Sequence, residues 1–280
     1  MLDFYFKDPM EIIDYSHLTS WRNDNPDFHL HEKFEIYFFI SGNLNYFIEK
    51  KVYKLKYGDL FIINSSEIHK PYFLSKGEYE RIVIHFDPAV ARLINSPQFD
   101  LLNCFTNRPK GELNKINLNK TQVEDFLKLL NKIEIADKIR SIGYEVLRFS
   151  HFIELLVFIN KAFLGNKHLE EQTNVPEKLI PILDFIDDNL GKELSLAVLE
   201  GKFFINRFYL SRLFKKTTGI SIHEYILFKR ISKAKELLSG RLNVTEVHQA
   251  VGFNDYSNFI RAFKKIVGVS PGRYKKSLSG

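Results

Sequence analysis

A basic motif occurs twice in the C-terminal part of the chain, and its residue types suit contact with nucleic acid. The first copy reads Leu210-Ser211-Arg212-Leu213-Phe214-Lys215-Lys216, and the second reads Phe259-Ile260-Arg261-Ala262-Phe263-Lys264-Lys265, 49 residues later at every matched position. A fixed period of this size is typical of a repeated supersecondary unit. Arginine can form paired hydrogen bonds with guanine, and lysine neutralises phosphates. The repeat therefore predicts a protein that contacts two adjacent stretches of DNA.

Helical spacing divides each motif into an apolar face and an outward face. The outward faces and their flanks give the expected DNA-binding residues: Arg207, Phe208, Ser211, Arg212 and Lys215 in the first copy, and Tyr256, Ser257, Asn258, Ile260, Arg261, Lys264 and Lys265 in the second. The arginines suit guanine, whereas Phe208 and Ile260 suit the methyl group of thymine. The lysines suit phosphates.

A second candidate site lies near the N-terminus, at His29, His31, Glu35 and His69. Alternation along a strand puts His29 and His31 on one face, where a further histidine and a carboxylate would complete a metal site. The same residues could instead bond a polar effector such as a sugar, or line an empty pocket. Effector contacts are the interpretation that we favour, with no metal and no cofactor.

Charge is unevenly distributed over the 280 residues, whose net charge is +6. Residues 177–280 hold 18 Lys and Arg against 10 Asp and Glu, a net charge of +8, while residues 1–176 have a net charge of −2. One region is therefore expected to meet a polyanion. Cys104 is the only cysteine, and we find neither a signal peptide nor a bilayer-length apolar run. These features predict a cytoplasmic protein that does not contact a membrane.

The two candidate sites fall in regions of different periodicity, which predicts an α+β fold. Short strands with glycine-containing turns between residues 34 and 86 are typical of a small antiparallel barrel or jelly roll. Apolar residues at helical spacing follow over 119–165, and we expect these helices, with Leu155 and Ile159, to form a dimer interface. Beyond Pro176 the pattern is helical, with a long helix from a cap at Ser221 to about Leu238.

The second repeat, with Gly252-Phe253-Asn254-Asp255 before it and Gly268-Val269-Ser270-Pro271 after it, resembles the signature of the AraC/XylS family of transcription regulators. The resemblance covers about residues 177–276. It implies two helix-turn-helix units joined by one long helix, bound to successive major grooves. The segment from His29 to Gly42, and Tyr57-Gly58-Asp59 followed by His69, resemble the two cupin motifs, although the second lacks its proline. Glu200 and His248 depart from the family pattern, which has a small alanine at each place.

This resemblance implies three segments: residues 1–165, a cupin-like effector-binding and dimerisation domain; 166–176, a linker; and 177–280, the DNA-binding domain. The implied partners are double-stranded DNA, a small-molecule effector, RNA polymerase and a second copy of the chain. A carbohydrate is one candidate for the effector. An activator is favoured over a repressor, and no enzyme activity is expected. Two alternatives stay open, a metal-dependent cupin enzyme fused to a DNA-binding domain and a regulator without an effector.

Overall fold

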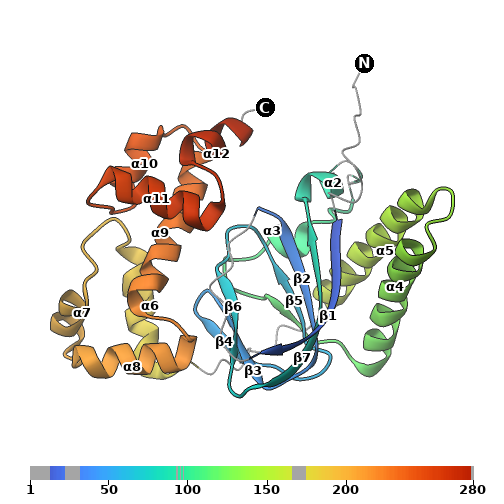
Figure 1. The fold of residues 1–280 in the computed structure, drawn as a ribbon, viewed down its shortest axis with the longest axis horizontal. Coiled ribbons are helices and arrows are strands. Elements are labelled where there is room, and N and C mark those ends of the chain that lie inside the picture. The colour runs from blue at the N-terminus through green and yellow to red at the C-terminus, as the bar shows by residue number, and fades with distance from the viewer. Residues whose placement is uncertain are drawn as a thin grey trace.

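The computed structural model describes residues 13–22, 32–92, 94, 96, 98–165 and 175–278. Figure 1 shows a strand-rich part in the middle, a pair of long helices, α4 and α5, on one side of it, and the remaining long helices gathered on the other. The described residues include no helix that is both long and apolar enough to cross a bilayer. Strands therefore dominate the first part of the chain and helices the last, as the α+β prediction requires.

The strands pair as two antiparallel sheets. The five-stranded sheet has the order β1 (Ile13–Arg22), β7 (Gly77–Phe86), β2 (Phe34–Ser41), β5 (Leu60–Ile63) and β8 (Lys115–Ile116). The three-stranded sheet has the order β4 (Lys51–Lys54), β3 (Leu44–Ile48) and β6 (His69–Phe73). The antiparallel prediction is confirmed, and among the described residues the strands pair as two sheets rather than as one closed barrel.

Both faces of the five-stranded sheet are buried. Along β2, Tyr37 and Phe39 enter a core that includes Tyr46 from the three-stranded sheet. The alternate residues Ile36 and Phe38 enter a second core, shared with α4 and α5. Because successive side chains of a strand point to opposite faces, burial on both sides gives the continuous apolar run seen in the sequence. Two short helices, α2 (Pro88–Arg92) and α3 (Asn103–Thr106), lie between β7 and β8 in the chain.

The helices α4 (Lys120–Ile139) and α5 (Tyr144–Gly165) cover the outer face of this sheet. A capping box formed by Asn119 and Gln122 begins α4. The side chains of Leu155 and Ile159 are 0% exposed within this single chain. The prediction that these two residues face a second copy is therefore wrong, because the sheet already covers them.

The C-terminal part consists of short helices around one long one. Its elements are η1 (Glu177–Leu179), α6 (Ile180–Asp188), α7 (Leu196–Phe203), α8 (Arg207–Thr218), α9 (Ile222–Leu238), α10 (Val244–Ala250), α11 (Tyr256–Val267) and α12 (Pro271–Leu278). The expected caps are confirmed, because side chains of Ser195, Asn206, Ser221 and Asp255 each accept a hydrogen bond from the helix that follows. We call α7 with α8 the first unit and α10 with α11 the second unit.

Helix α9 packs on the outer face of the three-stranded sheet. Phe47, Val52 and Ile68 from the strand-rich part belong to the same core as the helices. Lys229, buried on α9, lies 2.5 Å from Oε2 of Glu49 and 3.0 Å from Oδ2 of Asp187. One helix therefore joins the two units to each other and to the sheets.

Candidate DNA-binding surface and effector site

Helix α8 presents a basic face to solvent. Asn206 accepts hydrogen bonds from the backbone of Phe208 and Tyr209, which fixes the start of the helix. Leu210 and Phe214 are fully buried and anchor the opposite face. Of the residues predicted to bind DNA, Arg207, Phe208, Arg212 and Lys215 are exposed, and Ser211 is half-buried. The helix is thus held by its apolar side and leaves its cations free of the core.

Helix α11 repeats this arrangement. Phe259 and Phe263 are buried, and Oδ1 of Asp255 accepts a hydrogen bond of 2.7 Å from the backbone of Asn258. Arg261 Nη2 donates to Oδ1 of Asn258 at 2.5 Å, so the arginine is oriented before any partner arrives. The predicted residues Tyr256, Ser257, Asn258, Arg261, Lys264 and Lys265 are exposed. Ile260 is the exception, being half-buried and packed against the core.

The two departures from the family pattern have different structural outcomes. Glu200 bends outward, where its Oε1 accepts a hydrogen bond of 3.1 Å from the backbone of Arg207, at the start of α8. It therefore satisfies one of the backbone donors that a helix start leaves open. His248 instead stacks edge-on against Tyr256, with ring centroids 5.4 Å apart. Its Nε2 is buried and has no hydrogen-bond partner within the described parts of the chain.

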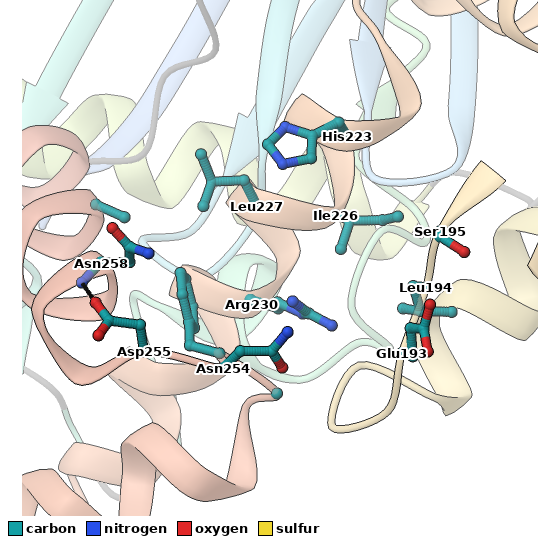
Figure 2. Close-up of a pocket in the computed structure, with 13 residues that line it drawn as sticks. Glu193, Leu194, Ser195, His223, Ile226, Leu227, Arg230, Asn254, Asp255 and Asn258 are labelled. Carbon is teal, nitrogen blue, oxygen red and sulfur yellow. Dashed lines mark hydrogen bonds between the residues drawn. The ribbon is translucent and has the colours of Figure 1, made fainter. Parts of the chain in front are cut away.

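A cleft of about 610 Å³ lies between the two units. Figure 2 shows Glu193, Leu194 and Ser195 on one side, Asp255 and Asn258 on the other, and Arg230 of α9 between them. His223 and Leu227 of α9 also line this cleft, whereas Tyr225 and Lys229 on the same helix contact Phe47 and Glu49 of the strand-rich part. Helix α9 thus has one face toward the sheets and another toward the cleft.

Two of the four N-terminal candidate residues meet at a buried carboxylate. Oε2 of Glu35 lies 3.1 Å from Nε2 of His69 and 3.0 Å from Nε2 of His85, while the Tyr46 hydroxyl donates to Oε1 at 3.1 Å. Glu35 and His69 are therefore brought together as predicted. His29 and His31 lie outside the described residues.

The hydrogen bonds of His69 define its proton positions. Nδ1 lies 2.9 Å from the carbonyl oxygen of Glu67, which can only accept, so Nδ1 carries a proton. Nε2 can then donate to the Glu35 carboxylate only when the ring is cationic. Burial alone would lower the pKa of His69, but the Glu35 carboxylate, with help from the Glu67 carbonyl, outweighs burial and raises the pKa above its ordinary value.

Comparisons with known proteins agree with both halves of this description. The model of the AraC-like ligand binding domain matches residues 15–133, and a helix-turn-helix domain model matches residues 199–277. The HTH-type transcriptional activator AarP of Providencia stuartii is 32% identical over 117 residues, which are 41% of this chain and 84% of AarP. The chain belongs to the AraC family of transcription regulators.

Two further similarities extend over different shares of this AraC-family regulator. The Msm operon regulatory protein of Streptococcus mutans is 25% identical over 253 residues, 89% of this chain and 86% of that protein. The solved C-terminal domain of the response regulator yesN from Fusobacterium nucleatum is 37% identical and covers 34% of this chain and 94% of that domain, with a TM-score of 0.33. Both matched family models describe parts of regulators, and the relatives named here are regulators.

Sequence reasoning missed His85 in this regulator, although a signal for it exists. His85 lies directly opposite Glu35 where β7 pairs with β2, so both side chains point to the same face of the sheet. That pairing joins strands 50 residues apart, and the register is set only when the sheet forms. Within the described residues, no group of three or more His, Cys, Asp or Glu side chains is arranged to hold a metal ion.

Proposed function

We propose that α8 and α11 enter two successive major grooves of double-stranded DNA and read its sequence. The observation that carries this proposal is the same exposed basic face on both helices, 49 residues apart. The spacer α9 has 17 residues, or about 25 Å at 1.5 Å per residue, and the width of the flanking units brings the separation toward the ~34 Å between grooves. The division into residues 1–165, 166–176 and 177–280 belongs to this proposal.

The roles of the side chains follow from their chemistry. Arg212 and Arg261 bond guanine, and Phe208 contacts thymine methyl groups, with the exposed part of Ile260 adding to that contact. Lys215, Lys264 and Lys265 contact phosphates, which strengthens binding to all sequences alike. The remaining expected contacts come from Arg207, Ser211, Tyr256, Ser257 and Asn258, whose polar groups suit phosphate or base edges.

Base preference tests these roles. An operator is first selected by the full-length protein from a random pool of duplexes, and Arg212→Ala and Arg261→Ala are then compared with wild type. Each variant should lose about 1–3 kcal/mol of binding free energy and relax the preference at its own half of the operator. Lys161→Ala, which removes an exposed cation from α5 on the opposite side of the sheets, is the control. Unchanged affinity and preference in both variants would refute the groove assignment.

The effector is proposed to be a small polar molecule, with a sugar as the leading candidate, bound near Glu35, His69 and His85. A buried carboxylate beside two imidazoles and the Tyr46 hydroxyl offers both acceptors and donors to hydroxyl groups. The nearby rings of Tyr37 and Tyr46 stack on each other with centroids 4.5 Å apart and are fully buried. These two rings are therefore core residues and not a wall for the ligand.

A short path of hydrogen bonds supports communication from this site to α9. Ile68 directly precedes His69 in the chain, and its backbone N–H donates to Oε1 of Glu49 at 2.8 Å. The other oxygen of Glu49 pairs with Lys229 on α9. Two residues earlier, the carbonyl oxygen of Ser66 accepts from Ser232 at 2.6 Å. An effector that displaces His69 therefore changes the contacts that Glu49 and Ser66 make with α9, provided that the effector binds one arrangement better than the other.

The proposal includes a cytoplasmic homodimer that activates transcription through RNA polymerase. AarP, similar over 117 residues of this chain, is called a transcriptional activator, and the Msm protein is named for an operon. Thermal-shift screening of sugars and sugar acids tests the effector half. The wild-type protein should be stabilised by one class of compound, and Glu35→Gln should lose that response. Flat responses across the whole panel would favour a regulator without an effector.

A further inference from the structure

The loop that leads into the first unit touches the main chain of the second unit beside α9, at two glycines. Gly191 lies in the loop between α6 and α7, and a Cβ atom there would lie 2.8 Å from the carbonyl oxygen of Ala250. Gly252 lies in the turn of the second unit with a φ of +78°, and a Cβ atom there would lie 2.4 Å from the carbonyl oxygen of Leu190. Real side chains do not tolerate such distances, so this approach requires glycine on both sides.

Arg230 fastens the same contact from α9. Its Nε donates to the carbonyl oxygen of Leu190 at 3.0 Å, and its Nη2 donates to that of Lys192 at 2.7 Å. Its guanidinium also lies 5.8 Å from the ring centroid of Phe253, in the turn of the second unit. Figure 2 shows this side chain reaching from α9 toward the loop that carries Glu193. One arginine thus links the spacer helix, the loop before α7 and the second unit.

This contact lies off the axis of α9, which gives it a distinct mechanical effect. Units attached only at the ends of one helix keep the freedom to swing about that helix, because each attachment is local. A third point of contact beside the helix removes this freedom, since it fixes the angle as well as the distance between the units. The planar, forked guanidinium suits this task because it directs hydrogen bonds along fixed directions.

We infer that Arg230, Gly191 and Gly252 form an inter-unit clamp. The clamp sets the spacing that the protein accepts between two DNA words, by which we mean the short base sequences contacted by α8 and by α11. The inference rests on the proposed insertion of α8 and α11 into successive grooves. One extra base pair moves the second word by about 3.4 Å and rotates it by about 35°, which a clamped pair of helices cannot follow. Arg230 is a positioning residue in this scheme and needs no contact with DNA.

The first test measures the separation of the two helices without DNA. Cysteines are introduced in the full-length protein by Lys215→Cys and Lys264→Cys, at equivalent exposed positions of α8 and α11. Cys104 is buried, and burial raises the pKa of its thiol, so spin labels react with the introduced pair. The labelled protein should show one narrow distance distribution by pulsed electron resonance, and Arg230→Met should broaden or shift it.

The second test varies the operator. On the operator selected by the wild-type protein, adding or removing one base pair between the words should weaken wild-type binding about tenfold or more, because one word loses its base contacts. Arg230→Met should tolerate the altered spacing within about threefold while binding either single word as wild type does. Arg230→Lys, which keeps the charge but loses the fork, should fall between them. Arg241→Met, at an exposed arginine outside the clamp, should keep the wild-type preference.

Two results would overturn the clamp: equal weakening of Arg230→Met on every spacing, or an unchanged distance distribution in both Arg230→Met and Gly191→Ala. Gly191→Ala keeps the arginine but pushes against the carbonyl group of Ala250, so it decides the matter if Arg230→Met fails to fold. A wild-type protein that selects no common DNA sequence contradicts the proposed function instead. In that case the distance measurement alone decides the clamp.

Discussion

Phe204 has a strained backbone conformation, and packing of its side chain does not offset the strain. Its φ is +51°, in the left-handed region, and its side chain is 95% exposed, so packing gives no compensation. A bulky residue in this region costs on the order of 1 kcal/mol or more. We predict that Phe204→Gly raises the free energy of unfolding by about 1 kcal/mol in urea titrations. Phe204→Ala retains the Cβ clash and should bring no such gain; a glycine variant no more stable than the alanine variant contradicts the strain.

His69 gives the protein a defined dependence on pH. Because its pKa is raised in the folded state, its contact with Glu35 stabilises fully below the unfolded value of about 6.5 and is lost as the pH rises through the folded value. The stability difference between wild type and His69→Gln should therefore shrink as the pH rises from about 6 to 9. His223→Gln, at an exposed histidine of α9, is the control. A difference that grows with pH would reverse the proposed charge state.

At this scale the sequence identified side chains better than it identified their partners. Glu35 and His69 were expected together, and they meet. His85 was not expected, because only the pairing of β2 with β7 brings it opposite Glu35. The exposed faces of the helices are predictable because local spacing determines them. Ile260 is half-buried because it packs against a core whose extent spacing alone does not determine.

Two glycines at the ends of equivalent helices in the two units offer an internal comparison between elements. Gly219 ends α8 and Gly268 ends α11, with φ of +79° and +87°. A Cβ on Gly219 would lie 2.4 Å from the ring of Tyr72 in the three-stranded sheet, whereas a Cβ on Gly268 would meet nothing within 4 Å. Both alanine variants should lose about 1 kcal/mol from backbone strain, and Gly219→Ala should lose more because Tyr72 must also move. Equal losses in urea unfolding would mean that α8 does not press on the sheet.

Element boundaries were predictable wherever a cap marked them. Ser221 begins α9 with a capping box to Glu224, and the expected end at about Leu238 is confirmed. The arrangement of the strands was less predictable, because an apolar run shows that a strand is buried but not which strand lies beside it. The division into two sheets depends on pairings such as β1 with β7, whose residues are more than fifty positions apart.

The whole molecule retains an apolar surface at the tip of the α4–α5 hairpin, and we propose that this tip pairs the two copies. Ile139, Ile142 and Val146 are 67%, 105% and 71% exposed. Clustered exposed apolar residues mark contact surfaces in soluble proteins. Ile139→Glu combined with Val146→Glu should therefore give a folded monomer in sedimentation, without lowering Tm.

Leu155→Glu provides the contrast for that measurement, because this buried residue supports the fold itself and its charged variant should unfold. A double variant that remains dimeric, or a wild-type protein that sediments as a monomer, would refute the tip as the interface. Leu155 and Ile159 illustrate a general point about helices. A stripe at helical spacing shows that one face is covered, but the neighbour that covers it is decided only by the complete fold.

The clamp around Arg230 has a consequence for how such a regulator evolves. Its partners, Leu190, Lys192 and Phe253, all lie outside the exposed faces of α8 and α11. Mutations on those faces can therefore change the base sequences that the protein recognises without changing the spacing between them. Related proteins that share the clamp would recognise different base sequences at the same spacing. Randomising the exposed positions of α8 and α11 alone should therefore yield new sequence specificities, all on operators with that spacing.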